Sequence, residues 1–494
     1  MKKVPPTQLS NLVPLLAIAM RFASEPTANL SYLVLALYSL FGRSPAIRAL
    51  FLSWFFTIAN SEIAPRASGA SLSRYVVILA AAVSMMLRDA TRRSSKSLSR
   101  QDVAGLKSIT LALGTVLVIH SLLFSPILDV SLLKLGAWVT VVVTLLSAWE
   151  GLEAPERAAM SDQLRSWLAA LLVLSLPLLA VPRIGYAVNG HGFQGLLNHS
   201  QSFGPTAALA AALLGGDILA APLPRWRDLA LIGLCMVLMV LSQARTAGIA
   251  WALGMLVLVT ASPAFAGKSW RTMLPALLSP RLMVVLFAAF VVAGLAGASF
   301  TNSLTEYIFK RGETGTLFDA AERSRGELVY RMVDNIQEQP LTGIGFGIGS
   351  SPQLMIVQRD PWFGIPVGAP VEKGVMPLAV LEELGVFGAL PVVAWILIIL
   401  RRGARAGAPQ FSVLVTLLLV NFGENMFFSV GGTGLLLMIL LTSAVTGTGT
   451  GQKSSRNNVR ADRGQSLDTA LRPALPATYI AAVETPPAAP RGSS

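Results

Sequence analysis

The chain carries repeated apolar runs, which are too long for the helices of a soluble domain. A helix needs about 20 mostly apolar residues to cross the hydrocarbon layer of a bilayer. Fourteen candidate spans lie near 11–23, 29–42, 47–60, 74–88, 107–126, 131–149, 165–182, 205–219, 228–242, 246–262, 281–299, 374–400, 409–428 and 432–447. Several are short, and the first two can also be interpreted as one broken element. The pattern predicts an all-α, polytopic integral membrane protein with 12 to 14 transmembrane helices.

Composition excludes an ordinary cytosolic enzyme. Of the 494 residues, 53% are hydrophobic and only 13% are charged, whereas soluble globular chains carry about a quarter charged residues. The single cysteine, Cys235, excludes an intramolecular disulfide. One cysteine and three histidines make a zinc cage improbable. We expect no metal and no cofactor.

Basic residues predict the orientation in the membrane. The net charge is +13, and in a membrane protein such an excess sits in cytoplasmic loops, so it does not indicate nucleic-acid binding. The clusters are Lys2 and Lys3, Arg43 and Arg48, the segment 88–107, Arg225 and Arg227, Lys268 to Arg281, and Arg401 to Arg405. With fourteen spans all of them fall on one side, together with both termini. No removable signal peptide is expected.

Three regions follow from this topology. Residues 1–182 form N-terminal transmembrane helices, residues 183–447 a membrane core, and residues 448–494 a disordered cytoplasmic tail rich in Gly, Ser, Pro and Arg. The outer face carries loop 183–204 and the long loop 300–373, and a loop of that length is usually functional. Within it, residues 321–336 have apolar positions at helical spacing and predict an amphipathic helix.

Two candidate sites lie in the outer turns of the core. Arg245 occupies a tight turn between two spans, where it either extends toward lipid headgroups or presents its guanidinium to a phosphate. Asn198, His199 and Gln201 form a polar cluster before a helix rich in small residues. The cluster either caps that helix or contacts substrate.

Further candidates lie in the long loop and after it. The amphipathic helix carries Arg323, Arg325 and Arg331, and the glycine string 340–349 follows it. Such a string can bring backbone amides close to an anion. Glu372 and Lys373 precede the next span, which itself contains the pair Glu382 and Glu383, and Glu424 lies at the outer end of another span. A carboxylate in or at the end of a span is energetically unfavourable unless it pairs with a cation or takes part in function.

In this order the motifs resemble those of the O-antigen ligase and polymerase superfamily of bacterial envelope proteins. His199-Ser200-Gln201 resembles a His-Pro-Asn motif, and Ser242-Gln243-Ala244-Arg245 resembles a Ser-x-Ser-Arg turn. An arginine-bearing helix followed by Pro340-Leu341-Thr342-Gly343-Ile344-Gly345 matches the large periplasmic loop. Leu381 to Gly388 fits the second half of a His-Asn-x-x-Leu…Glu-x-Gly pattern. The resemblance covers roughly residues 180 to 445.

The chain departs from the ligase pattern at one position. Glu372-Lys373-Gly374 stands where the ligases have His-Asn, and in ligases that histidine is thought to act in catalysis. The departure favours a polymerase-type member with a fold similar to the GT-C class. The resemblance implies a multi-pass protein of the bacterial inner membrane that joins glycans carried on polyprenyl pyrophosphate. Its implied partners are membrane lipids, a flippase and a chain-length regulator.

The resemblance and the residues together suggest a metal-independent, inverting glycosyl transfer. Arg245 and Arg325 would stabilise the leaving pyrophosphate, with Arg323 or Arg331 as substitutes. Glu372 would be the base that takes the acceptor proton, with Glu424 second. His199, Gln201 and Lys373 would bind substrate. The alternatives, in order, are an O-antigen ligase acting on lipid A core, a polysaccharide flippase or transporter, and a structural scaffold.

Overall fold

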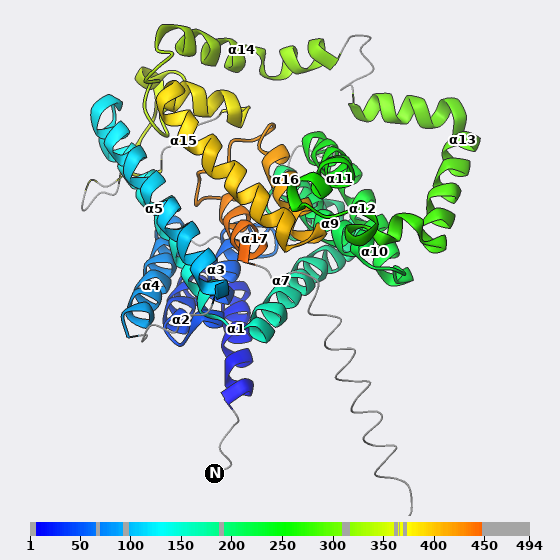
Figure 1. Cartoon of the computed structure of the whole chain (residues 1–494). Coiled ribbons are helices and arrows are strands. Elements are labelled where there is room, and N and C mark those ends of the chain that lie inside the picture. Colours follow the sequence, from blue (N-terminus) through cyan, green and yellow to red (C-terminus); the bar gives the residue numbers. More distant parts are fainter. Residues whose placement is uncertain are drawn as a thin grey trace, which may run out of the picture. The chain divides into compact units, whose positions relative to one another are not determined.

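A computed structural model describes residues 6–65, 70–91, 98–186, 192–308, 317–359, 364, 366–368 and 373–446 of the chain (Figure 1). Residues 1–449 form one compact unit. Its longer helices are α1 (Pro6–Ala23), α2 (Glu25–Ser39), α3 (Arg43–Thr57), α4 (Ala70–Ala90), α5 (Leu98–Phe124), α6 (Leu128–Gly151), α7 (Ala154–Ser175), α9 (Ser200–Ala220), α10 (Trp226–Ser242), α11 (Arg245–Ala266), α13 (Pro280–Ile308), α14 (Leu317–Glu338), α15 (Met376–Ala406), α16 (Ala408–Val420) and α17 (Gly434–Thr446). The predicted tail lies outside the described residues.

Short elements join these helices. They are η1 (Leu176–Ala180), α8 (Pro182–Gly185), α12 (Trp270–Met273), η2 (Pro275–Leu278), η4 (Pro352–Leu354), β1 (Gln358–Arg359) and β2 (Pro366–Gly368). β1 and β2 pair antiparallel in a two-stranded sheet within the long loop. The architecture is otherwise helical, which confirms the all-α prediction.

Each predicted span overlaps at least one helix, because in lipid a helix satisfies its own backbone hydrogen bonds. Six segments are long and apolar enough to cross a bilayer: Val103–Phe124, Leu128–Gly151, Ala154–Ala180, Ser200–Ala220, Arg245–Ala266 and Met376–Ala406. The chain is thus a multi-pass membrane protein. α1 and α2 are two separate helices that pack together, joined at Ser24, which caps α2.

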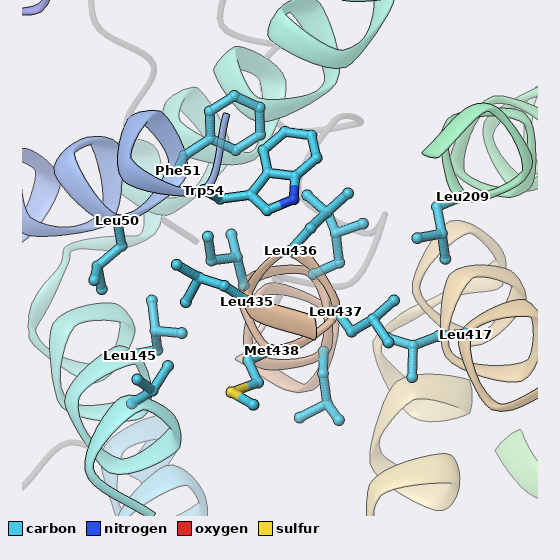
Figure 2. Packing of buried hydrophobic residues seen from close by; sticks show 14 of the residues in the cluster. Leu50, Phe51, Trp54, Leu145, Leu209, Leu417, Leu435, Leu436, Leu437 and Met438 are labelled. Atoms are coloured by element: carbon cyan, nitrogen blue, oxygen red, sulfur yellow. The ribbon is translucent and has the colours of Figure 1, made fainter. Parts of the chain in front are cut away.

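Helix α17 is enclosed by other helices, as Figure 2 shows. It is apolar around its whole circumference, and a helix of that kind is stable only when covered on all sides. Around Leu435, Leu436, Leu437 and Met438 lie Leu50, Phe51 and Trp54 of α3, Leu145 of α6, Leu209 of α9 and Leu417 of α16. Helices from before and after residue 182 therefore share one apolar core.

Basic residues from separate turns meet at one end of this bundle. Arg43 and Lys107 both pair with Asp89, at 3.0 and 2.9 Å. Arg157 donates to the backbone oxygen of Thr446 at 3.3 Å and so connects the start of α7 to the end of α17. Two of the basic clusters predicted to face the cytoplasm, at Arg43 and Lys107, thus meet at Asp89. The loop before α9, the turn before α11 and the segment between α16 and α17 lie at the other helix ends, which we call the site end.

The long loop contains the amphipathic helix that the sequence predicts. It is α14, longer than the predicted 321–336 segment, and it packs on α15. Met332 is buried, whereas Tyr330 on another face of α14 is exposed. The preceding helix α13 runs further into the predicted loop than expected, because its chain continues in helical form past a break at Gly297 (φ +46°).

Candidate functional site

The loop before α9 and the turn before α11 lie against each other at the site end. The amide of Phe193 donates to the backbone oxygen of Leu241 at 2.8 Å. Gly204 in the first turns of α9 approaches Ser242 and Ala244 so closely that a Cβ would collide with both. The turn itself uses Gln243 in the left-handed region (φ 55°). The His199 and Arg245 motifs are therefore neighbours in space.

His199 is the N-cap of α9. Its extended backbone precedes the helix, and its Nδ1 accepts the amide proton of Gln201 at 3.0 Å. This hydrogen bond satisfies one of the free amides in the first turn. Because Nδ1 is the acceptor, Nε2 carries the proton of the neutral ring. His199 and Gln201 are both exposed, so the ring has the predicted capping role and still presents a donor to solvent.

A non-helical segment, residues 421–433, connects α16 to α17 and reaches two of the predicted motifs. Gly423 packs against the side chain of Thr246, the residue after Arg245. The amide of Asn425 donates to the backbone oxygen of Lys373 at 3.2 Å. Irregular backbone is tolerated at membrane depth only where protein or water satisfies it. The chain around Glu424 therefore lies between the Arg245 turn and Lys373.

Asn421 holds this segment in place. Its side-chain amide donates to the backbone oxygen of Leu417 at 2.7 Å, and its Oδ1 accepts the amide of Met426 at 2.9 Å. Its backbone oxygen accepts the amide of Met376 at the start of α15 at 3.0 Å. Asn421 is fully buried. One residue thus fixes the end of α16, the start of α15 and the turn that carries Glu424.

Lys373 is buried, and its ammonium is enclosed by two carboxylates. Its Nζ lies 2.7 Å from Glu382 Oε2 and 3.1 Å from Glu383 Oε1. Asn335 of α14 donates to the other oxygen of Glu382 at 2.7 Å, and the amide of Gly347 donates to Glu383 at 2.6 Å. The sequence predicted that Lys373 binds substrate. The structure instead shows its charge engaged by the protein itself, which gives Lys373 a structural role.

The glycine string 340–349 supplies hydrogen-bond partners at a break in α15. At Gly385 (φ +57°) the backbone leaves the helical path, so neighbouring peptide groups lose their intrahelical partners. The string replaces them: the amides of Ile344 and Gly345 donate to the backbone oxygens of Glu382 and Glu383, and the amide of Val386 donates to Pro340. The amides of Ile344 and Gly345 therefore bind backbone oxygens of the protein and do not bind a substrate anion.

Helices α5 and α6 anchor the same string with side chains that the sequence did not single out. His120 Nε2 lies 2.7 Å from the backbone oxygen of Thr342, Ser131 donates to Phe346 at 2.6 Å, and Lys134 donates to Gly347 at 2.7 Å. Lys134 is a single charge inside an apolar run. That isolated charge is the signal that could have identified it.

The arginines of α14 are not placed beside Arg245 by any described contact. Arg331 is exposed and donates to Ser351 Oγ at 3.0 Å and to Glu327 at 2.5 Å. Arg323 and Arg325 lie on α14, but their side chains are outside the described part of the structure. Glu372 lies outside the described residues as well. Of the predicted site, the structure thus brings together the chain around His199, Arg245, Lys373 and Glu424.

Within the described residues, no group of three or more His, Cys, Asp and Glu side chains is arranged to hold a metal ion. No protein-family model matches the chain, and no curated protein matches it significantly.

Proposed function

We propose that this membrane protein polymerises glycans carried on polyprenyl pyrophosphate at the outer face of the bacterial inner membrane, with both termini in the cytoplasm and 12 to 14 spans. The observation that supports this most is the meeting of the predicted motifs at one end of the bundle. Gly423 contacts Thr246, and Asn425 binds Lys373. Thr246 follows Arg245, and Gly423 and Asn425 flank Glu424, so the chain beside Arg245 and Lys373 meets the chain beside Glu424 although the three are far apart in sequence.

The proposed reaction is a single displacement at the anomeric carbon of the donor sugar. The acceptor hydroxyl oxygen forms the new glycosidic bond as the bond to the pyrophosphate breaks, and the electron pair leaves on the pyrophosphate. Arg245 stabilises this growing charge together with Arg325. Glu372 takes the proton of the hydroxyl, with Glu424 as the second candidate. Attack from the face opposite the leaving group inverts the configuration. His199 and Gln201 orient the lipid-linked substrate.

Substitution of the arginine and the proposed base tests this function. Arg245→Ala and Glu372→Gln should each lower polymer formation in cells by on the order of 100-fold, the usual effect of removing one stabilising group from a transition state. Arg245→Lys should also fail if two parallel hydrogen bonds to phosphate are needed. Protein level should remain normal. Full-length polymer in both Arg245→Ala and Glu372→Gln would reject the proposal.

Matched controls come from exposed residues of the same kind. Arg227→Ala removes an arginine at the start of α10, whose side chain is 76% exposed. Glu62→Gln removes an exposed carboxylate at the site end. Both should leave polymer unchanged. A comparison of Glu424→Gln with Glu372→Gln identifies the base. The variant that lacks the base should lose polymer formation at every pH, whereas the other variant should keep most of it.

Chain length separates the polymerase from the ligase alternative. Loss of a polymerase leaves single repeats, whereas loss of a ligase leaves long chains on the lipid carrier. Analysis of the lipid-linked fraction in the Arg245→Ala strain therefore decides between them.

Transport of lipid-linked glycan is the second candidate, and the broken helix α15 favours it. Discontinuous helices with charged residues near the break are typical of transporters, and α15 breaks at Gly385 beside Glu382 and Glu383. Under this alternative, Arg245→Ala would leave the repeat units on the cytoplasmic side of the membrane. Labelling of outward-facing glycan in that strain distinguishes the two functions.

A further inference from the structure

A buried arginine outside the site described above makes no hydrogen bond and no ion pair within the described part of the chain. Arg74 lies near the start of α4 and is only 7% exposed. Its Nε is completely covered and makes no hydrogen bond, and Arg74 forms no ion pair among the described residues. Its guanidinium lies over the ring of Tyr75, 5.3 Å from the ring centre.

Arg74 borders the same irregular segment that carries Glu424. Both of its terminal nitrogens lie 3.9 Å from the position that a Cβ would take on Gly431. The segment 421–433 therefore contacts the Arg245 turn at Gly423 and approaches Arg74 at Gly431. Because residue 431 is a glycine, space remains next to the Arg74 guanidinium. A side chain at position 431 would occupy that space.

A second buried arginine adds to the positive charge in this region. Arg21 of α1 is 4% exposed and donates to the backbone oxygens of Phe56 and Pro65. Both Arg21 and Arg74 interact electrostatically with the phenol of Tyr32, whose hydroxyl lies 3.3 Å from Thr57 Oγ1. Arg21 finds carbonyl dipoles, and no carboxylate among the described residues pairs with either arginine.

A buried guanidinium without a counter-charge is unfavourable, and in a membrane protein such a residue usually serves function. A bound anion would remove the cost. The planar fork of arginine matches two oxygens of a phosphate group, and lipid-linked substrates bring phosphate to this depth of the membrane. Tyr32 adds a hydroxyl that can donate to the same anion.

We propose that Arg74 is a binding residue for the diphosphate group of a polyprenyl-linked substrate, facing Gly431 on the site end of the bundle. The identity of the ligand rests on the proposed function, whereas the presence of an anion site rests on the unpaired guanidinium alone. Arg21 supports the site by its charge. Arg74 was not among the residues that the sequence singled out, because it resembles any arginine at the end of an apolar run.

The test measures thermal stabilisation of the purified full-length protein by polyprenyl diphosphate, with inorganic pyrophosphate and phosphatidylglycerol as further probes. A ligand that binds the folded state raises the melting temperature, and the rise grows with the logarithm of ligand concentration over Kd. Wild type should be stabilised by polyprenyl diphosphate, and Arg74→Met should lose that stabilisation, with affinity at least about tenfold lower. Arg88→Met is the matched control, because Arg88 lies on the same helix and donates to Leu40.

The ligand-free proteins give a second readout. Removal of an unpaired buried charge should leave the melting temperature of Arg74→Met equal to wild type or higher, which a purely structural arginine would not do. Should Arg74→Met not fold, Arg74→Lys keeps the charge, loses the fork and should bind diphosphate more weakly. Stabilisation of the folded variants equal to wild type would overturn the proposal. So would an equal Arg74-dependent effect of phosphatidylglycerol, which would assign the site to bulk lipid.

The two proposals fail separately. Normal polymer in both the Arg245→Ala and the Glu372→Gln strains, with diphosphate binding that depends on Arg74, would remove the polymerase function and keep the anion site. Loss of polymer in Arg245→Ala, with normal diphosphate binding by Arg74→Met, would keep the function and remove this site.

Discussion

Lys373 and Glu382 form an ion pair inside the protein: Lys373 Nζ lies 2.7 Å from Glu382 Oε2, and neither side chain is exposed. Lys373 precedes α15, and Glu382 lies just before its break at Gly385. Together with Glu383 and Asn335, the pair ties the long loop, α14 and α15 into one structure at the site end.

Removal of one partner of this pair should destabilise the protein strongly. Lys373→Met leaves two buried carboxylates without their counter-charge, which costs about 3–5 kcal/mol in comparable cases. The melting temperature in detergent should fall, and polymer formation should fall with it. Glu327→Gln serves as the control, because the exposed pair between Glu327 and Arg331 contributes little. A melting temperature equal to wild type in Lys373→Met would contradict the structural role.

The glycine string should be sensitive at one glycine and tolerant at another. Gly343 has φ +66°, and a Cβ there would lie 2.6 Å from the backbone oxygen of Glu382. Gly343→Ala should therefore strain the backbone and separate the string from α15, by at least about 1–3 kcal/mol of stability. Gly349→Ala is the control in the same string, since nothing lies within 4 Å of the added atom. Equal melting temperatures for the two variants would argue against this packing.

His199 should have two separable roles. His199→Ala removes the cap of α9 and should cost about 1 kcal/mol of stability. His199→Asn keeps a capping side chain but removes the ring nitrogen that faces solvent, so stability should be kept while polymer formation falls. Thermal unfolding and polymer analysis of both variants check this. If His199→Asn forms normal polymer, the histidine serves only as a cap.

The ion pairs of Asp89 should make stability depend on pH. Burial alone raises the pKa of Asp89, but the hydrogen bonds and charges of Lys107 and Arg43 outweigh it and lower that pKa below its ordinary value. A carboxylate with a lowered pKa stabilises the folded state above its unfolded pKa, near about 3.9, and loses this contribution as the pH falls through the folded pKa. Asp89→Asn should therefore be less stable than wild type at pH 7, and the difference should shrink below about pH 4. A constant difference would contradict the assignment.

Local sequence patterns were sufficient for the helices. Apolar runs predicted the positions of α5, α6 and α9, because a spanning helix satisfies its hydrogen bonds within one segment. Helical spacing of Leu328, Met332 and Ile336 predicted α14 in the same way. The burial of α17 on all sides could not be predicted in this way, because an apolar helix that faces lipid and one that faces protein have similar sequences.

The amino-acid sequence by itself determined where the helices lie, which turns carry the basic clusters, and which polar residues lie in the turns between the helices. Only the tertiary structure decided what the charged residues do, pairing Lys373 with Glu382 and leaving Arg74 without a carboxylate partner among the described residues. The physical reason is that helix formation depends on neighbours along the chain, whereas the free energy of a buried charge depends on neighbours in space.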